Sequence, residues 1–284
     1  MQAEAQDTAS PAARFELPAL ACDAHCHVFG PRDRFPYAPN RNYTPPEDKP
    51  KEALAALHQR LGLSRAVIVQ ASCHGSDNRA MLDALRHEPA RYRGVAIIDD
   101  DTTDTELRQM HDAGVRGIRF NFIKSLGGAP DMRVFHRAAD RVRPMGWHMV
   151  MHLQGDGVRE QEEVIRRLGM PVVIDHLGRV DPALGVEGPA FAKLLELLRD
   201  ERIWAKLSGA ERMTRRPFTE ALPFQRTLLR AAPTRVLWGT DFPHPNLATP
   251  VDEMELVNLI PDFAPTAEDR QRLLVDNPAT LYDF

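Results

Sequence analysis

Short apolar segments recur along the chain, separated by stretches whose apolar residues repeat at helical spacing. The apolar segments predict eight β-strands, near residues 20–25, 66–71, 94–99, 117–122, 148–152, 171–176, 203–208 and 235–241. Within 52–62, Leu54, Leu57 and Leu61 fall on one helical stripe, and Gly62 is typical of a helix C-terminus. Similar patterns predict further helices at 77–88, 132–142, 159–169 and 190–200, with a weaker one near 218–231.

The order of these elements points to one fold class. Eight strands alternating with helices are what a (β/α)8 TIM barrel requires. A doubly wound sheet is the competitor, but no glycine-rich phosphate turn follows the first predicted strand. We therefore expect a single α/β barrel domain at 18–284, preceded by a loose polar arm at 1–17. The proline-rich segment 29–50 should lie at the carboxyl end of the barrel, where active sites are built.

Composition narrows the class of protein. The 284 residues are 43% hydrophobic and 27% charged, as in an ordinary globular enzyme. A net charge of −4 argues against a basic surface that coats nucleic acid. The three cysteines show no CxxC spacing, so a disulfide framework is not expected. Because no segment resembles a signal peptide or a membrane span, we expect a cytoplasmic protein without nucleic-acid or membrane partners.

Polar side chains stand at or just after the end of each predicted strand. They are His25 and His27, Ser72 and His74, Asp99, Arg119 and Asn121, His152, Asp175 and His176, Lys206 and Ser208, and Asp241 followed by His244 and Asn246. His25 and His27 should share one face of their strand while Cys26 faces away. Such a pair either grips a metal or consists of polar residues satisfied in a core. By the same alternation, Asp175 should point outward if His176 points inward.

Barrel closure brings some of these residues together. The first and eighth strands are neighbours in a closed barrel, and the fifth and sixth face them across a narrow bore. His25, His27, His152, His176 and Asp241 are therefore expected to converge at one end of the barrel, which packing alone does not explain.

Several segments carry a family resemblance: "DAHCHVFGP", "VIVQASCHGSDN", "GIRFNF", "IDHLGR", "WGTDFPHPN" and "IPDFAPT". In this order the chain, over roughly residues 18–284, resembles the amidohydrolase superfamily. Within it, the chain is most similar to the lactonases that act on 2-pyrone-4,6-dicarboxylate, 4-sulfomuconolactone or sugar lactones. The resemblance implies a hydrolase that opens a carboxylated or sulfonated lactone in aromatic-compound catabolism. A sugar lactonase and an amidohydrolase-type decarboxylase of an aromatic acid are the alternatives; an inactive ligand-binding barrel is disfavoured by the intact Asp241.

Two departures from the dicarboxylate lactonases bear on the chemistry. Those enzymes have Tyr at the position of His152 and work without a metal, whereas other amidohydrolases use a histidine there as a ligand. The resemblance thus implies one divalent metal, Zn2+ or Mn2+, held by His25, His27, His152 and Asp241. The alternative is no cofactor, with Asp241 activating water directly. The second departure is Ser125, which replaces an arginine that follows the lysine of this loop.

The implied roles complete the expected site. Asp241 would take a proton from the attacking water and pass it to the leaving oxygen, and His176 would orient or polarise the carbonyl. Arg119 and Arg212 would clamp a carboxylate of a small anionic lactone, although Arg212 is equally compatible with a solvated surface. Further substrate contacts are expected from Lys124, Tyr43, Ser72, His74 and Asn246. The protein is expected to be a monomer or a small homo-oligomer.

Overall fold

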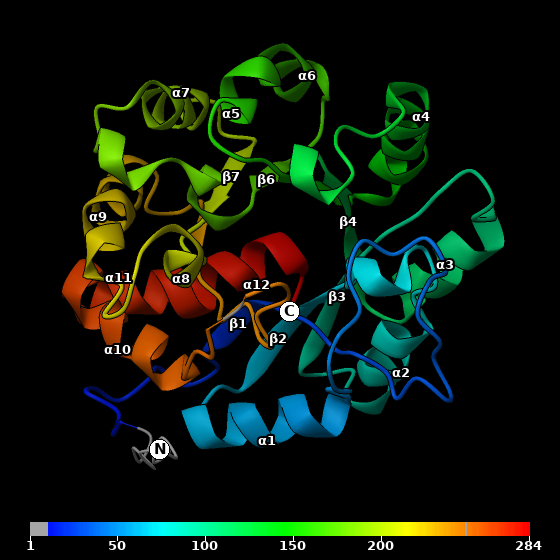
Figure 1. The fold of residues 1–284 in the computed structure, drawn as a ribbon, viewed down its shortest axis with the longest axis horizontal. Helices are drawn as coiled ribbons and strands as arrows, with labels where there is room; N and C mark the ends of the chain where they lie inside the picture. Colours follow the sequence, from blue (N-terminus) through cyan, green and yellow to red (C-terminus); the bar gives the residue numbers. More distant parts are fainter. Residues whose placement is uncertain (1–10, 248) are drawn as a thin grey trace, which may run out of the picture.

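Eight parallel strands, paired in the order β1 to β8, form the centre of the computed structural model, which describes residues 11–247 and 249–284 (Figure 1). The strands are β1 (Cys22–Cys26), β2 (Arg65–Val69), β3 (Tyr92–Ala96), β4 (Val115–Asn121), β5 (His148–His152), β6 (Val172–Ile174), β7 (Ile203–Lys206) and β8 (Val236–Leu237). Each of the eight predicted strands overlaps one of them. The predicted (β/α)8 barrel is therefore confirmed.

Helices surround the strands (Figure 1). They are α1 (Lys51–Leu61), α2 (Arg79–His87), α3 (Asp104–Asp112), α4 (Met132–Val142), α5 (Gly157–Glu160), α6 (Glu162–Arg167), α7 (Pro189–Leu197), α8 (Ala210–Met213), α9 (Leu222–Ala231), α10 (Glu253–Phe263), α11 (Ala267–Gln271) and α12 (Asn277–Tyr282). The predicted helix at 159–169 is divided at Gln161, and α3, α8 and α10 to α12 were not predicted. No helix in the described part of the chain is long and apolar enough to cross a membrane.

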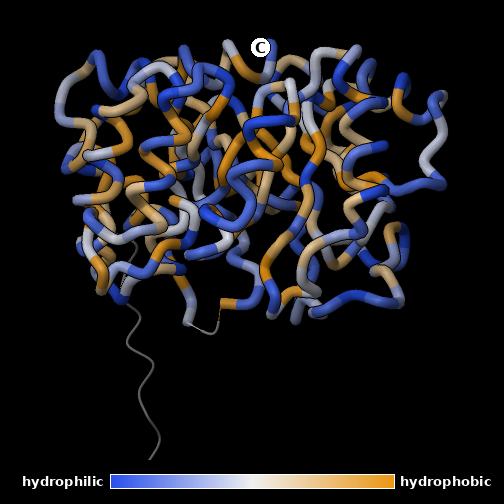
Figure 2. Tube along the Cα trace, turned by 90° about the horizontal axis from the view of Figure 1, so that it is seen from above, coloured by the Kyte–Doolittle hydropathy of each residue, from blue (hydrophilic) through white to orange (hydrophobic). Residues whose placement is uncertain are grey.

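Apolar side chains pack in two layers. The inner layer fills the bore with alternate residues of the strands and is closed by a tyrosine of α12: Cys22, Ala24, Val67, Val69, Val95, Val150, Val173, Trp204, Leu237 and Tyr282. A larger cluster lies between the strands and the helices. Figure 2 shows hydrophilic segments along the outer edges of the molecule and hydrophobic segments between them. Because apolar side chains fill the bore, a ligand site must lie beyond them, at one end of the strands.

An irregularity in β1 sets the direction of the two histidines. Asp23 pairs with Ala66 and Cys26 pairs with Ile68, so three residues of β1 advance while β2 advances by two. An extra residue of this kind is a β-bulge, which re-aims the side chains that follow it. Ala24 can therefore belong to the inner layer while His25, the next residue, also faces the bore.

Backbone hydrogen bonds close the barrel between β1 and the segment after β8. Ala24 N donates to Trp238 O at 2.8 Å, and Asp241 N donates to the carbonyl oxygen of His25 at 2.8 Å. His27 N donates to the carbonyl oxygen of Phe242 at 2.7 Å. This seam holds Asp241 beside the two histidines, as expected for neighbouring strands.

The buried carboxylate of Asp23 reinforces the seam. It accepts hydrogen bonds from the backbone N of His25 at 3.1 Å, from the backbone N of Thr240 at 3.0 Å and from the Thr240 hydroxyl at 2.5 Å. Nε2 of His58 in α1 lies 3.2 Å from Oδ2, the oxygen that also accepts from the Thr240 hydroxyl. Gly239 allows the close approach, because a Cβ there would lie only 2.4 Å from His25 N.

The predicted N-terminal arm is only partly among the described residues, since residues 1–10 lie outside them. Its described part contacts α10: Arg14 N donates to Asn258 Oδ1 at 2.8 Å, and the Arg14 guanidinium pairs with Asp262 at 2.7 Å. The division into an arm and a barrel domain stays a prediction.

Candidate active site

A cavity of about 290 Å³ opens at the carboxyl ends of the strands. Its lining comes from strand ends and the loops that follow: His27, Asn42, Tyr43, Ser72, Ile97, Arg119, Asn121, Ser125, Leu126, His152, His176, Arg179, Arg212, Asp241, Pro245, Asn246 and Leu247. Asn42 and Tyr43 belong to the segment 29–50, so this proline-rich loop lies where it was expected. The cavity is large enough for a small-molecule substrate.

Asp241 lies buried against this cavity and faces three histidines. Its Oδ1 is 3.3 Å from Nε2 of His27, 3.6 Å from Nε2 of His25 and 3.9 Å from Nε2 of His176, and it accepts no hydrogen bond from the described residues. The other carboxylate oxygen contacts Nε of Arg212. Burial would raise the pKa of Asp241, but the Arg212 guanidinium and the imidazoles lower it well below the usual range. The carboxylate is therefore ionised at neutral pH.

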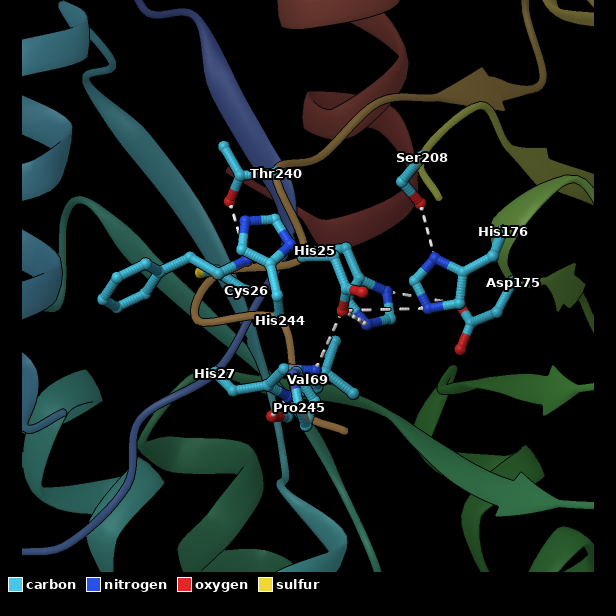
Figure 3. Close-up of polar contacts among 12 residues, drawn as sticks. His25, Cys26, His27, Val69, Asp175, His176, Ser208, Thr240, His244 and Pro245 are labelled. Atoms are coloured by element: carbon cyan, nitrogen blue, oxygen red, sulfur yellow. Dashed lines mark hydrogen bonds and ion pairs between the residues drawn. The ribbon is translucent and has the colours of Figure 1, made fainter. Parts of the chain in front are cut away.

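The second ring nitrogen of each histidine has its own partner. Nδ1 of His27 lies 2.8 Å from the carbonyl oxygen of Val69, which can only accept a hydrogen bond. Nδ1 of His176 lies 3.0 Å from the hydroxyl of Ser208, which can donate or accept (Figure 3). Burial lowers the pKa of His176 well below its usual value, although Asp241 opposes this. His176 is thus neutral and can either donate to or accept from a ligand.

The structure corrects the expectation for Asp175, whose carboxylate points into the bore. Its Oδ2 accepts from Nε of Arg119 at 2.9 Å, and its Oδ1 lies 3.2 Å from Nζ of Lys206 and 3.3 Å from Nδ1 of His25. Strand alternation fails here because β6 ends at Ile174 and the backbone turns to a φ of 51° at His176. Two consecutive side chains can then reach the interior.

Lys206 received no role from the sequence, yet it is fully buried beside the site. Nζ donates to Nδ1 of His25 at 2.9 Å. Burial, together with the Lys206 ammonium, lowers the pKa of His25 to about 4, so the imidazole is neutral at pH 7. A lysine inside the apolar run "IWAKLS" was the available signal, since lysine is almost never fully buried unless it is paired.

Three arginines line the cavity: Arg119, Arg179 and Arg212. The side chain of Arg212 is only 8% exposed, so the alternative of a solvated surface residue is wrong. Arg179 was missed, although it lies in the same "IDHLGR" segment as His176. Burial and the nearby Arg212 lower the pKa of Arg179, as expected where like charges gather. Arg119 and Arg212 pair with Asp175 and Asp241, so the cluster offers guanidinium donors to the cavity with part of its charge already balanced.

The remaining predicted contacts divide into two groups. Tyr43, Ser72 and Asn246 line the cavity. His74 is buried but does not line it, because its ring nitrogens lie 3.2 Å from the backbone N of Gly30 and 3.2 Å from the carbonyl oxygen of Pro36. Lys124 is exposed and also lies outside the lining.

Metal binding can be tested against the donor atoms. Nitrogens of His25 and His27 and an oxygen of Asp241 all lie within 4.8 Å of one another, a group that could hold a metal ion. His152 is not in this group, although its Nε2 is buried without a hydrogen-bond partner in the described chain and its ring centre is 5.5 Å from that of His176. Two of the three grouped residues also face cations, because Arg212 contacts Asp241 and Lys206 contacts His25. The four-ligand set fits this environment poorly, since a dication would be added beside those charges.

Comparisons with known proteins agree with this architecture. The chain is 45% identical to a 2-pyrone-4,6-dicarboxylate hydrolase of Comamonas testosteroni, over 95% of this chain and 92% of that protein. It is 38% identical to a 4-sulfomuconolactone hydrolase of Hydrogenophaga intermedia, over 95% and 90% of the two chains. A crystal structure from Pseudomonas putida, provisionally assigned as a 2-pyrone-4,6-dicarboxylic acid hydrolase, superposes with a TM-score of 0.82 at 33% identity, over 94% and 98%. The amidohydrolase family model matches residues 22–284, and the chain belongs to the amidohydrolase family.

Proposed function

We propose that this protein hydrolyses the ring ester of a small lactone that carries carboxylate or sulfonate groups, as part of the breakdown of aromatic compounds. The observation that carries this proposal is the ionised Asp241 facing three imidazoles, in a cavity whose wall holds three arginines. The curated relatives, hydrolases of a pyrone dicarboxylate and of a sulfomuconolactone, support the same substrate class.

Asp241 is the group best suited to activate water. Its Oδ1 is free to accept a proton, while Arg212 holds the other oxygen in place. Water attacks the ester carbonyl carbon as Asp241 takes its proton, the ring C–O bond breaks, and Asp241 returns the proton to the leaving oxygen. His176, on the same side of the cavity, would polarise the carbonyl oxygen. The products are a hydroxyl or enol and a new carboxylate, so one proton is released per turnover.

The arginine wall supports an anionic substrate. Arg119 uses Nε for Asp175, while its terminal nitrogens make no hydrogen bond within the described residues and the side chain lines the cavity. Arg179 adds a second guanidinium to the same lining. Guanidinium groups bind carboxylates and other oxyanions with paired hydrogen bonds. Ser125 also lines the cavity and would contact the substrate through a hydroxyl in place of a charge.

A divalent ion, Zn2+ or Mn2+, is the second candidate for the chemistry. The group of His25, His27 and Asp241 supports it, and such an ion would polarise the carbonyl and activate water. The ammonium at His25 and the guanidinium at Asp241 favour the reaction without a metal.

The test combines a lactone panel with metal analysis. Protein purified without chelator is assayed by proton release on pyrone dicarboxylate, sulfomuconolactone, a sugar lactone and an uncharged lactone, and by CO2 release on these and on an aromatic carboxylic acid. Ring opening of the anionic lactones with one proton and no CO2 per turnover is the expected result. Release of CO2 from an aromatic acid would favour the decarboxylase, and preference for the sugar lactone would favour that alternative. About one equivalent of metal per chain, with activity lost on chelation, would favour the metal-dependent reaction.

A further inference from the structure

In the "HCH" segment, Nδ1 of one histidine faces a hydrogen-bond donor and Nδ1 of the other faces an acceptor. Nδ1 of His25 lies 2.9 Å from the ammonium of Lys206, and Nδ1 of His27 lies 2.8 Å from the carbonyl oxygen of Val69. An ammonium carries donors only, whereas a carbonyl oxygen can only accept. With these neighbours, a neutral His25 ring carries its hydrogen on Nε2, whereas a neutral His27 ring carries it on Nδ1.

Lys206 has one carboxylate counter-ion in the bore, which it shares with Arg119. It is fully buried, and its Nζ is 3.2 Å from a carboxylate oxygen of Asp175, whose other oxygen binds Arg119. Burial and the Arg119 guanidinium lower the pKa of Lys206 from its usual value, and the Asp175 carboxylate opposes them. With Asp175 as its counter-ion, the Lys206 ammonium donates to Nδ1 of His25.

We propose that Lys206 is a positioning residue, which fixes the Nε2–H tautomer of His25 and so makes His25 a hydrogen-bond donor to the reacting carbonyl oxygen. This role rests on the proposed lactone hydrolysis. His25 Nε2 is buried without a hydrogen-bond partner among the described residues and lies 3.6 Å from Asp241 Oδ1. When a lactone binds with its carbonyl carbon next to Asp241, where the attacking water would lie, an N–H at this point would donate to the carbonyl oxygen.

The opposite tautomer gives His27 a complementary task. In the Nδ1–H tautomer, Nε2 of His27 and Asp241 Oδ1 are two acceptors 3.3 Å apart, so a water molecule that donates a hydrogen to each would satisfy both. His27 and Asp241 would thus orient the attacking water, while His25 stabilises the oxygen that becomes negative. The two histidines of one motif would differ in role because their outer neighbours differ.

A rival arrangement uses the same atoms. Asp175 Oδ1 is 3.3 Å from Nδ1 of His25 and could accept a hydrogen from it, which would free Nε2 for a metal. The geometry favours Lys206, because its contact with His25 is shorter and meets the criteria of a hydrogen bond, whereas Asp175 Oδ1 has no hydrogen-bond partner among the described residues. The two arrangements differ in the position of one hydrogen atom.

Nitrogen NMR of the unliganded protein reads that position directly. In protein with 15N-labelled histidine, long-range proton–nitrogen correlations should show an unprotonated Nδ1 and a protonated Nε2 for His25, and the reverse for His27. A His25→Gln variant assigns the signals by removing one set. A protonated Nδ1 on His25 in the wild type would overturn the proposal, whether or not any variant folds.

Two variants of the lysine test its effect on the reaction. Lys206→Met removes the donor, so His25 should shift toward the Nδ1–H form and kcat should fall on the order of 100-fold with a much smaller change in KM. Lys206→Gln keeps a neutral N–H donor and should retain the tautomer and most of kcat. Equal losses in both variants, with the His25 tautomer unchanged, would show that Lys206 only balances charge. The NMR result needs no substrate, so a protein that shows the expected tautomers yet opens no lactone would refute the proposed function separately.

Discussion

Adding one methyl group at Gly239 should damage both stability and activity. A Cβ at this position would lie 2.4 Å from His25 N, 2.7 Å from His25 Cβ and 2.8 Å from Asp23 Oδ1. The first distance is about 1 Å shorter than an ordinary contact, and the atom it meets is backbone that cannot rotate away. Relief requires the segment after β8 to move away from β1 by about that distance.

Such a shift would break the seam that holds the site. The seam contains three backbone hydrogen bonds of 2.7 to 2.8 Å, each worth about 1 kcal/mol net, so Gly239→Ala should lower the free energy of unfolding by about 3 kcal/mol. Because Asp241 lies in the moving segment, a displacement of about 1 Å should also lower kcat roughly 100-fold.

Urea unfolding followed by circular dichroism, with kcat on the best lactone, measures both effects. Gly157→Ala is the matched control, because a Cβ there meets only Leu153 Cδ2 at 4.0 Å and should leave stability unchanged or slightly higher. A Gly239→Ala protein with the stability and kcat of the wild type would refute the claim that close packing of this seam positions Asp241.

Three other predictions concern charge. Asp241→Asn should fold normally but lose kcat by about 100-fold or more, because an amide cannot accept the proton of water; a kcat near wild type would place the base elsewhere. Arg119→Met should raise KM for anionic lactones by roughly tenfold or more and change uncharged lactones far less, whereas equal losses would give Arg119 a structural role. His244 lies between Glu211 and Glu253, at 3.7 and 3.5 Å; burial opposes its charge, but the two carboxylates raise its pKa to about 9. Its charged form should therefore add up to about 3 kcal/mol of stability that is present below about pH 6.5 and lost as the pH rises through 9, a slope that urea unfolding should find in the wild type and not in His244→Gln.

The recurrence of apolar segments was enough to predict the barrel. Each buried strand must be apolar over several residues, and each outer helix must be apolar on one face. The eight strands and most of the helices can therefore be recognised from the spacing of apolar residues in the sequence. Closure of the barrel then follows from strand order, which explains why Asp241 could be expected beside His25 and His27. Helices α10 to α12 follow the last strand, where the strand–helix alternation used for the prediction had ended.

Side-chain direction was predictable only where the backbone is regular. Alternation correctly set His25 and His27 on one face, but it gave the wrong direction for Asp175, because β6 ends one residue earlier. The bulge in β1, which turns His25 into the bore, arises from its pairing with β2 and leaves no periodic signal.

The sequence by itself determined the fold class, the end of the barrel that carries the site and the types of residue gathered there. Tertiary structure alone decided which neighbour each polar group meets: Lys206 at His25, Val69 at His27, and Arg212 at Asp241. The physical reason is range. Hydrophobic burial depends on the average character of a segment, so it can be recognised from the spacing of apolar residues along the sequence. A hydrogen bond or an ion pair depends on the placement, within a fraction of an ångström, of atoms contributed by distant parts of the chain.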